Sequence, residues 1–383
     1  MRIAFYAPLK WPEHPVPSGD RLLARMFMAA FAASGHEVSV AARLRSWDGA
    51  GNSTRQARLA RVGRWCASRL IARWRRDPSA TPELWFTYHL YHKAPDWIGP
   101  PVCAALGIPY VIAEASVASK QRDGPWRDGH AAAIAAIRAA DAVICLNPAD
   151  LAGVAAVRES LAPPQQVPPF FDAAAFLDGA RDEAALARIR ALGLPQDSPR
   201  LVAVAMLRPG DKLVSYRVLA AALTRLLHRP WHLVVVGDGA ARAEVGAAFA
   251  SFPPGRIHFA GSQPPAVVAA LLQRSDLFVW PAVLEVIGMA LLEAQACGVP
   301  VVAGRRPGVE AVVAEGSSGI LVPPGDDAAF AAAVDSLISD PARRAVMARR
   351  AREYVRERHD LPAASAALDA ILTRALRDRP AAA

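Results

Sequence analysis

Short apolar runs alternate with amphipathic helical patterns along almost the whole chain, and this alternation restarts near the middle. The first series opens at "RIAFYAPL" (2–9) and the second at "RLVAVAML" (200–207), with the proline-rich stretch "APPQQVPPFF" (162–171) between them. Alternating strands and helices of this kind form parallel sheets that are covered by helices on both faces. The sequence therefore predicts an α/β protein with two doubly wound domains.

The restart also predicts where the domains divide. We expect an N-terminal domain at residues 1–168 and a C-terminal domain at 169–360, with a last helix at 361–378 packing back on the first domain. Ligands of doubly wound sheets bind at the carboxyl ends of the strands. With two such domains facing each other, we expect the binding site in a central cleft between them.

Composition narrows the protein class. With 53% hydrophobic and 21% charged residues the chain is globular, not disordered. Its four cysteines show neither a C-x-x-C pair nor zinc spacing, which favours a reducing compartment. The first strand pattern begins at Arg2, so we expect no signal peptide. The longest apolar stretch, 284–302, is interrupted by Glu293, Gln295 and Pro300, so we expect no membrane span and a cytoplasmic location.

The net charge of +9 is concentrated in one segment. Residues 43–76 hold ten of the 44 basic residues and one of the 35 acidic ones, which leaves 34 of each for the rest of the chain. A helix predicted at 54–76 carries eight of these arginines and a narrow apolar stripe formed by Leu59, Val62, Cys66, Leu70 and Trp74. This pattern fits a helix lying on its own domain with arginines outward, a helix on an anionic membrane, or a solvated face.

The stretch "LEVIGMALLEAQACGVPVV" (284–302) holds two glutamates, Glu285 and Glu293, in otherwise apolar surroundings. A strand ends just before Glu285, and Gly288 opens a helix whose first backbone N–H groups lack partners, which suits an anion. Two carboxylates flanking such a site suit a ligand with a phosphate in the middle and hydroxyls at each end. The alternative is structural, with Glu285 as an N-terminal helix acid and Glu293 paired with an arginine.

Three further segments supply groups at the same predicted edge. "MLRPGDK" (206–212) places Arg208 and Lys212 after the first strand of the second domain, where they would neutralise a diphosphate. Gly237 and Gly239 follow the next strand and allow close backbone approach, although the spacing is not a dinucleotide fingerprint. Gly19 lies at a loop-to-helix junction of the first domain, where most glycines simply permit a turn.

Together these residues resemble the retaining, nucleotide-sugar-dependent glycosyltransferases of family 4, which have the GT-B fold. The resemblance covers nearly the whole chain and rests above all on the E-x7-E spacing followed by "ACGVPVV" (296–302). "SGDR" (18–21), "GHEV" (35–38), "LRPGDK" (207–212) and "VVGDG" (235–239) support it. It implies two Rossmann-like domains, a nucleotide-diphosphate sugar as co-substrate and no other cofactor.

The resemblance also implies roles for individual residues. Arg208 and Lys212 would bind the diphosphate, Glu293 the ribose, and Glu285 the donor sugar, with Glu285, Arg208 and Lys212 as the catalytic set. The remaining donor-binding residues it implies are Gly19, Gly237, Asp238, Ile287, Gly288 and Met289. On the acceptor side the candidates are His89 and Lys93, with His92 beside them, and Glu114.

The chain departs from the family pattern at several positions. Val286 and Ile287 stand where the family commonly has Gly and Phe, and Ala282 where it has Ser. Pro307 replaces the first of a Gly pair, and Glu114 stands where a His is frequent. These changes bear on the donor sugar and the acceptor more than on the fold.

The expected function is transfer of a sugar, with retention at the anomeric carbon, to a glycan that is lipid-linked or belongs to the cell envelope, as in polysaccharide biosynthesis. No D-x-D carboxylate pair is present, so we expect a metal-independent reaction. Two alternatives remain: a protein that binds nucleic acid or an anionic surface through the 54–76 helix, and a sugar-nucleotide epimerase of the same fold. As an accessory role, that helix would hold the enzyme peripherally at the inner face of a membrane, and nucleic acid is the less expected partner.

Overall fold

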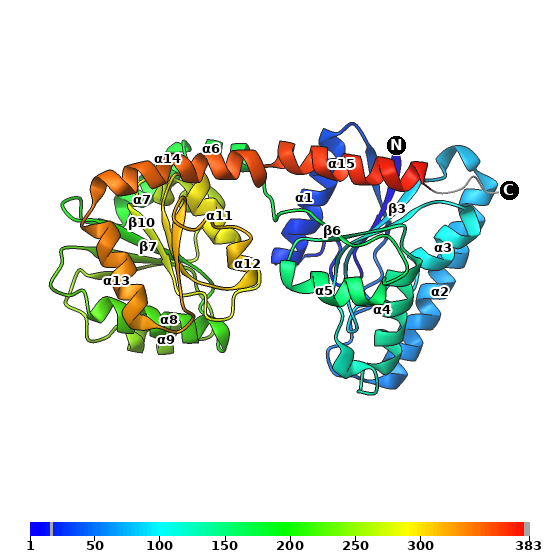
Figure 1. Ribbon diagram of the computed structural model, residues 1–383, viewed down its shortest axis with the longest axis horizontal. Helices are drawn as coiled ribbons and strands as arrows, with labels where there is room; N and C mark the ends of the chain where they lie inside the picture. Colours follow the sequence, from blue (N-terminus) through cyan, green and yellow to red (C-terminus); the bar gives the residue numbers. More distant parts are fainter. Residues whose placement is uncertain (16–17, 379–383) are drawn as a thin grey trace. The chain divides into compact units, whose positions relative to one another are not determined.

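The computed structural model describes residues 1–15 and 18–378. It divides the chain into two compact units (Figure 1). Unit 1 runs from Met1 to Phe171 and resumes at Leu361, and unit 2 runs from Asp172 to Asp360. The division at Phe171 lies three residues beyond the boundary expected from the sequence.

Unit 1 is built on a six-stranded parallel sheet with the order β2-β1-β3-β4-β5-β6. Its strands are β1 (Arg2–Tyr6), β2 (Glu37–Ala42), β3 (Leu84–Leu90), β4 (Tyr110–Ala115), β5 (Ala142–Cys145) and β6 (Gln165–Gln166). Its helices are α1 (Gly19–Ala33), α2 (Ser53–Arg76), α3 (Gly99–Leu106), α4 (Arg127–Ala139), α5 (Pro148–Val157) and α15 (Leu361–Arg377). Strand order reverses between β1 and β3, which is the switch point of this sheet.

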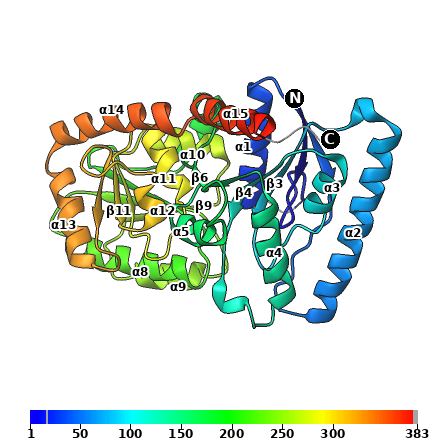
Figure 2. The same cartoon turned by 45° about the vertical axis from the view of Figure 1, so that its right-hand side comes forward.

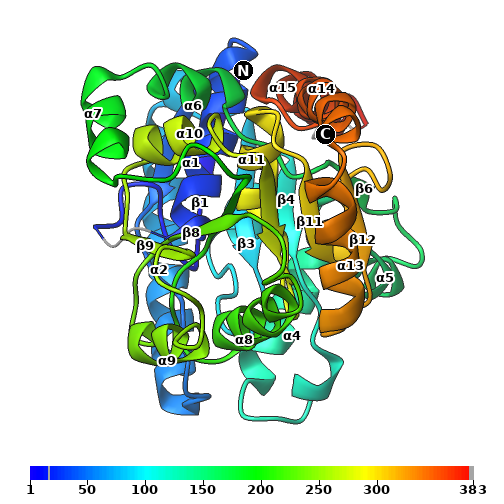
Figure 3. The same cartoon turned by 90° about the vertical axis from the view of Figure 1, so that its left-hand side faces the viewer.

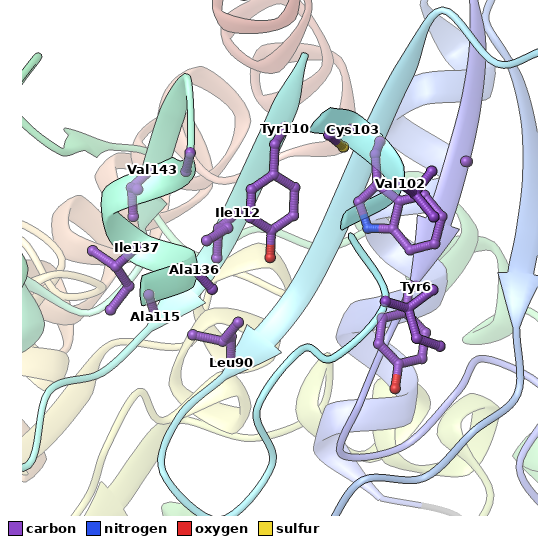
Figure 4. Packing of buried hydrophobic residues seen from close by; sticks show 14 of the residues in the cluster. Tyr6, Leu90, Val102, Cys103, Tyr110, Ile112, Ala115, Ala136, Ile137 and Val143 are labelled. Carbon is purple, nitrogen blue, oxygen red and sulfur yellow. The ribbon is translucent and has the colours of Figure 1, made fainter. Parts of the chain in front are cut away.

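The two faces of this sheet are covered by different helices because side chains alternate along each strand. Phe86 of β3 packs against Phe27 and Phe31 of α1. The other face carries Trp85, which meets Trp74 of α2. Figure 4 shows the cluster on that second face, in which α3 and α4 also cover the strands. Helix α15 lies against α1, and its Asp369 pairs at 2.9 Å with His36, which lies between α1 and β2.

Helix α2 lies along unit 1 (Figure 2), and Cys66, Leu70 and Trp74 of its apolar stripe pack into the unit 1 core. Ala60, Ala67 and Trp74 are buried, and Gly63 packs so closely on Trp97 that a Cβ there would lie 2.3 Å from the Trp97 Cβ. The eight arginines of the helix are exposed, and no ion pair within the described residues involves any of them. The helix thus lies on its own domain with its arginines outward, which is one of the arrangements expected from the sequence.

Unit 2 has a second six-stranded parallel sheet, with the order β12-β11-β10-β7-β8-β9. Its strands are β7 (Arg200–Val204), β8 (His232–Val236), β9 (Ile257–Gly261), β10 (Leu277–Trp280), β11 (Val301–Gly304) and β12 (Gly319–Val322). Its helices are α6 (Ala173–Gly179), α7 (Glu183–Ala191), α8 (Asp211–Thr224), α9 (Arg242–Ala248), α10 (Pro265–Leu272), α11 (Met289–Ala296), α12 (Pro307–Glu310), α13 (Asp327–Ile338) and α14 (Pro341–Arg358).

This second sheet has the strand order of a Rossmann fold, with its switch point between β7 and β10. Helices α8, α9 and α13 cover one face, and α10 and α11 cover the other (Figure 3). The strands read as continuous apolar runs because both faces are buried. The GT-B architecture expected from the sequence, with two Rossmann-like doubly wound domains, is therefore confirmed at the level of each unit.

The structure differs from the expected elements in two places that matter for the site. The apolar run at 200–207 that opens the second series forms a strand only as far as Val204, and the next helix, α8, begins at Asp211, after Gly210 with φ 82°. Lys212, expected after the first strand, therefore stands in the first turn of α8. The C-terminal region forms three helices, α13, α14 and α15, since Asp340 caps α14 and Pro341 starts it where the sequence analysis named only the last helix. Within the described residues, no helix has the length and apolar composition needed to cross a bilayer.

Candidate functional site

The carboxyl edge of the unit 2 sheet holds an ion pair across the switch point. Lys212 in the first turn of α8, after β7, and Glu285 in the loop after β10 meet with 2.5 Å between Nζ and Oε2. The indole Nε1 of Trp280, the last residue of β10, donates to the same Oε2 at 2.9 Å. The Lys212 and Glu285 side chains are only 15% and 16% exposed, so the pair is partly withdrawn from water.

The sequence assigned Lys212 and Glu285 to different parts of a ligand, whereas the structure brings them together. Trp280 was missed, although its place at the end of a strand and five residues before Glu285 was the available signal. Its ring also lies under the Lys212 ammonium group, 5.2 Å from Nζ. Lys212, Glu285 and Trp280 therefore form one polar cluster whose charges are available to a ligand at the switch point.

The loop that carries Glu285 is held rigidly. Ala282 adopts φ 50°, a left-handed conformation that is rare for a residue with a Cβ. The backbone of Val283 is fixed on both sides, by Ser215 of α8 at 3.1 Å and by the Arg306 guanidinium at 2.7 Å. A Cβ on Gly308 would lie 1.6 Å from the carbonyl oxygen of Val286, so glycine is required where α12 packs on this loop.

Helix α11 presents an open N-terminus beside Glu285. Its N-cap is Gly288, with φ 77° and no side chain to accept a hydrogen bond, so the first amides of the helix lack a side-chain cap. Such amides, with the helix dipole behind them, attract an anion. Ile287, Gly288 and Met289, the donor-binding positions expected here, all retain partial exposure.

Glu293 lies further along α11 and behaves differently from Glu285. Burial raises the pKa of its carboxyl to about 7, although the side chain keeps some contact with solvent. No ion pair or side-chain hydrogen bond involves it within the described residues, so the structural alternative of an arginine partner is not observed. A buried carboxyl without a protein partner is costly, and a ligand hydroxyl would relieve that cost.

The remaining donor-side residues surround the first strands of unit 2. Arg208 is exposed on the loop after β7. Asp238 is engaged locally, since its Oδ1 accepts from the amide of Gly239 at 2.8 Å and lies 3.5 Å from Arg242. The close approach expected at Gly237 is real, but the neighbour is the protein itself, because a Cβ there would lie 1.9 Å from the Ala205 carbonyl oxygen. Gly237 therefore allows the loop after β8 to pack closely on the loop after β7.

On the acceptor side, His89 is the next-to-last residue of β3 and Glu114 that of β4, and both have positive φ, 63° and 58°. Glu114 Oε1 accepts from the amides of Leu146 at 2.6 Å and Asn147 at 3.3 Å, and burial raises its pKa. Through Oε1, Glu114 thus connects β4 to the turn before α5.

Lys93 and Gly19 are the other two candidate residues of the first domain. Lys93 packs its Nζ over the ring of Trp126 at 4.7 Å and forms no ion pair with Glu114 within the described residues. Gly19 begins α1 behind the N-cap Ser18, and a Cβ on Gly19 would meet no atom within 4 Å. The space beside Gly19 is therefore open, as a glycine that approaches a ligand requires.

Known proteins resemble part of this chain in sequence. Residues 187–354 match the family model described as glycosyl transferases group 1. The D-inositol 3-phosphate glycosyltransferase of Stackebrandtia nassauensis is 34% identical over 196 residues, 47% of this chain and 42% of that protein. The protein of the same name from Corynebacterium urealyticum is 41% identical over 98 residues, 26% of this chain and 23% of that protein. The chain thus matches less than half of the length of these relatives.

Solved structures resemble nearly the whole chain. A glycosyltransferase from Rickettsia africae has a TM-score of 0.74 at 14% identity and covers 98% of this chain and 99% of its own. Sucrose-phosphate synthase from Thermosynechococcus elongatus has a TM-score of 0.68 at 19% identity, with 97% and 98% covered. At these identities the likeness shows the fold alone, and that fold is GT-B. Residues 187–354, which include both glutamates of E-x7-E, are therefore similar to the glycosyl transferases group 1, in agreement with the resemblance to family 4.

Proposed function

We propose that this protein is a retaining glycosyltransferase that moves a sugar from a nucleotide-diphosphate sugar to an acceptor hydroxyl. The observation that carries the proposal is the cluster at the switch point of unit 2, where Lys212, Glu285 and the open N-terminus of α11 meet. A cation, a carboxylate and free amides at one place can hold a diphosphate and the hydroxyls of its sugar together.

The groups of this cluster bind different parts of the donor according to their charge. The diphosphate takes Lys212, exposed Arg208 and the first amides of α11. Glu285 turns from Lys212 to a hydroxyl of the transferred sugar, and Glu293 accepts from the ribose hydroxyls. The structure of Anabaena HepE, a protein with the same fold, was solved with UDP and with UDP-glucose, which supports a nucleoside diphosphate in this role.

The reaction then needs no protein nucleophile. The bond from the anomeric carbon to the diphosphate oxygen breaks, and its electron pair leaves with the diphosphate. The acceptor oxygen bonds to the same face of the anomeric carbon, and its proton passes to a diphosphate oxygen. Lys212 and Arg208 stabilise the charge that develops on the leaving group, so a divalent metal is not required.

For the acceptor we propose a lipid-linked or cell-envelope glycan, bound by unit 1, as in polysaccharide biosynthesis. The eight exposed arginines of α2 support peripheral contact with an anionic inner membrane face, because they lack ion-pair partners within the described residues. Trp65, 57% exposed with the Arg69 guanidinium 4.9 Å from its ring centroid, adds an amphipathic group suited to an interface. The relatives named for inositol 3-phosphate offer a small polyol phosphate as the first alternative acceptor.

A thermal-shift panel of nucleotide-sugars tests the proposal, since a ligand that binds the native state raises the melting temperature. We expect one nucleotide-sugar donor to stabilise the protein. The glycoside formed from that donor should show the donor's anomeric configuration in a proton NMR spectrum. Inversion would refute retention. Conversion of the donor without any acceptor would identify an epimerase, and stabilisation by nucleic acid alone would favour the binding protein.

A further inference from the structure

Unit 1 also holds an acid–base pair across its switch point. Asp20 stands in the first turn of α1, the helix after β1, and His89 is the next-to-last residue of β3, the neighbouring strand. Their side chains meet with 3.0 Å between Nδ1 and Oδ1, and they are 35% and 30% exposed. This arrangement repeats that of unit 2, where Lys212 begins the helix after the first strand and Glu285 follows the neighbouring one.

The chemistry of this pair fixes which nitrogen of His89 is free. The hydrogen bond from His89 lowers the pKa of Asp20, with the positive charge of Lys10 adding to the effect, so the carboxylate is ionised at neutral pH. An ionised carboxylate only accepts, so Nδ1 must carry the hydrogen. Nε2 is then the nitrogen left to meet a ligand.

Asp20 is not needed to cap its helix. Ser18 is the N-cap of α1, and its hydroxyl accepts from the amide of Arg21 at 3.2 Å. Meanwhile His89 is held in a left-handed backbone conformation with its ring between Tyr88 and Tyr91, at centroid distances of 5.8 and 5.3 Å. Such a conformation costs free energy and persists where the surroundings enforce it. The contacts of His89 thus fix both its backbone and its ring.

We propose that Asp20 is a positioning residue that holds the His89 imidazole with Nε2 directed at a hydroxyl of the acceptor. The inference rests on the proposed function and adds to it a residue in the first domain. The charged groups around His89 are Asp20 on α1, Glu114 on β4 and Asp150 on α5, with Lys10 near Asp20. Of these, Asp20 is the one hydrogen-bonded to the ring.

The test compares Asp20→Asn with Glu13→Gln, a change in the preceding loop that removes only an exposed contact to Arg43 at 3.8 Å. We expect Asp20→Asn to lower kcat/KM for the acceptor by about 10- to 100-fold, as expected when a reacting group is misplaced. The Kd of the donor should stay unchanged, and Glu13→Gln should match the wild type in both.

A spectroscopic measurement separates this role from a merely structural one. In protein labelled with ¹⁵N-histidine and assigned through His89→Gln, the wild type should carry hydrogen on Nδ1 of His89 at pH 8, and Asp20→Asn should show a mixture of tautomers. An unchanged acceptor kcat/KM and an unchanged His89 tautomer in a folded Asp20→Asn variant would overturn the inference. If the wild type itself transfers no sugar from any donor, the proposed function has failed instead.

Discussion

Lys212 and Glu285 form a short ion pair at 2.5 Å, although 73 residues separate them in the chain. They meet because α8 follows β7, the loop of Glu285 follows β10, and these two parallel strands are neighbours at the switch point of the sheet. Trp280 supports the carboxylate from the end of β10. In the proposed complex, the phosphates and hydroxyls of the ligand replace the contact between Lys212 and Glu285. Before the ligand binds, the ion pair holds both charges in position.

We expect Glu285→Gln to slow transfer with little loss of donor affinity. The variant keeps the size of the side chain but removes the charge that faces Lys212, so kcat should fall by about 10- to 100-fold. Trp280→Phe, which removes one hydrogen bond and keeps an aromatic ring, should cost about tenfold or less. Steady-state kinetics with the identified donor measures both, and a Glu285→Gln variant with wild-type kcat would remove Glu285 from the catalytic set.

Glu293 should couple donor binding to pH. Its carboxyl has a pKa of about 7, so the carboxylate that accepts from ribose hydroxyls is lost as the pH falls below 7. Donor affinity should therefore drop between pH 8 and pH 6 in the wild type, and it should be weak and nearly flat in Glu293→Ala. A wild-type Kd that does not change over this range would contradict the role given to Glu293.

Glu293 should lower the free energy of unfolding when no ligand is bound. The folded-state pKa of Glu293 is raised above the ordinary value of 4.5, so the folded state binds more protons than the unfolded state between these two values. The contribution of Glu293 to the free energy of unfolding therefore falls as the pH rises from 4.5 to 7. The Glu293→Gln variant does not lose stability in this way. Denaturation should show Glu293→Gln more stable than the wild type at pH 8, with a smaller gain at pH 5. The exposed Glu244→Gln serves as the matched control and should show no such gain.

Much of this account follows from the sequence, and the exceptions have physical reasons. The apolar runs predicted most strands of both sheets, because strands buried on two faces read as continuous hydrophobic segments. Asp340–Pro341 was the available signal for the third C-terminal helix, and it was overlooked. The contacts of Lys212 with Glu285 and of Asp20 with His89 could not be predicted, since they depend on which strands become neighbours. Trp280 was passed over because an aromatic residue at the end of a buried strand is usually part of the core.

Activity should persist in excess EDTA. In the proposed reaction Lys212 and Arg208 supply the positive charge that the leaving diphosphate requires, so chelation should leave the rate unchanged. Among the residues that the structure describes, no group of three or more His, Cys, Asp and Glu is arranged to hold a metal ion. Initial rates with and without EDTA should agree. Loss of activity on chelation that magnesium or manganese restores would refute this prediction.

Helix α2 should bind anionic vesicles reversibly. Anionic lipid attracts basic residues close to its surface by about 1 kcal/mol each, so half of the eight exposed arginines would suffice at low salt. The protein should sediment with anionic liposomes at low salt, stay free with neutral ones, and be released at high salt. Arg58, Arg61, Arg69 and Arg76 replaced together by Gln should abolish sedimentation and leave transfer to a soluble acceptor intact. A wild type that ignores anionic liposomes at low salt would leave α2 as a solvated face.

The most direct test of the central claim is the rate at which nucleoside diphosphate is released from the stabilising nucleotide-sugar in the presence of an acceptor. The account predicts release matched by formation of a glycoside of the same anomeric configuration. This rate should fall at least about tenfold in Lys212→Ala and Glu285→Gln and stay unchanged in Glu244→Gln. If release does not occur with any nucleotide-sugar, or proceeds equally well in the Lys212 and Glu285 variants, the switch-point cluster is not the active site.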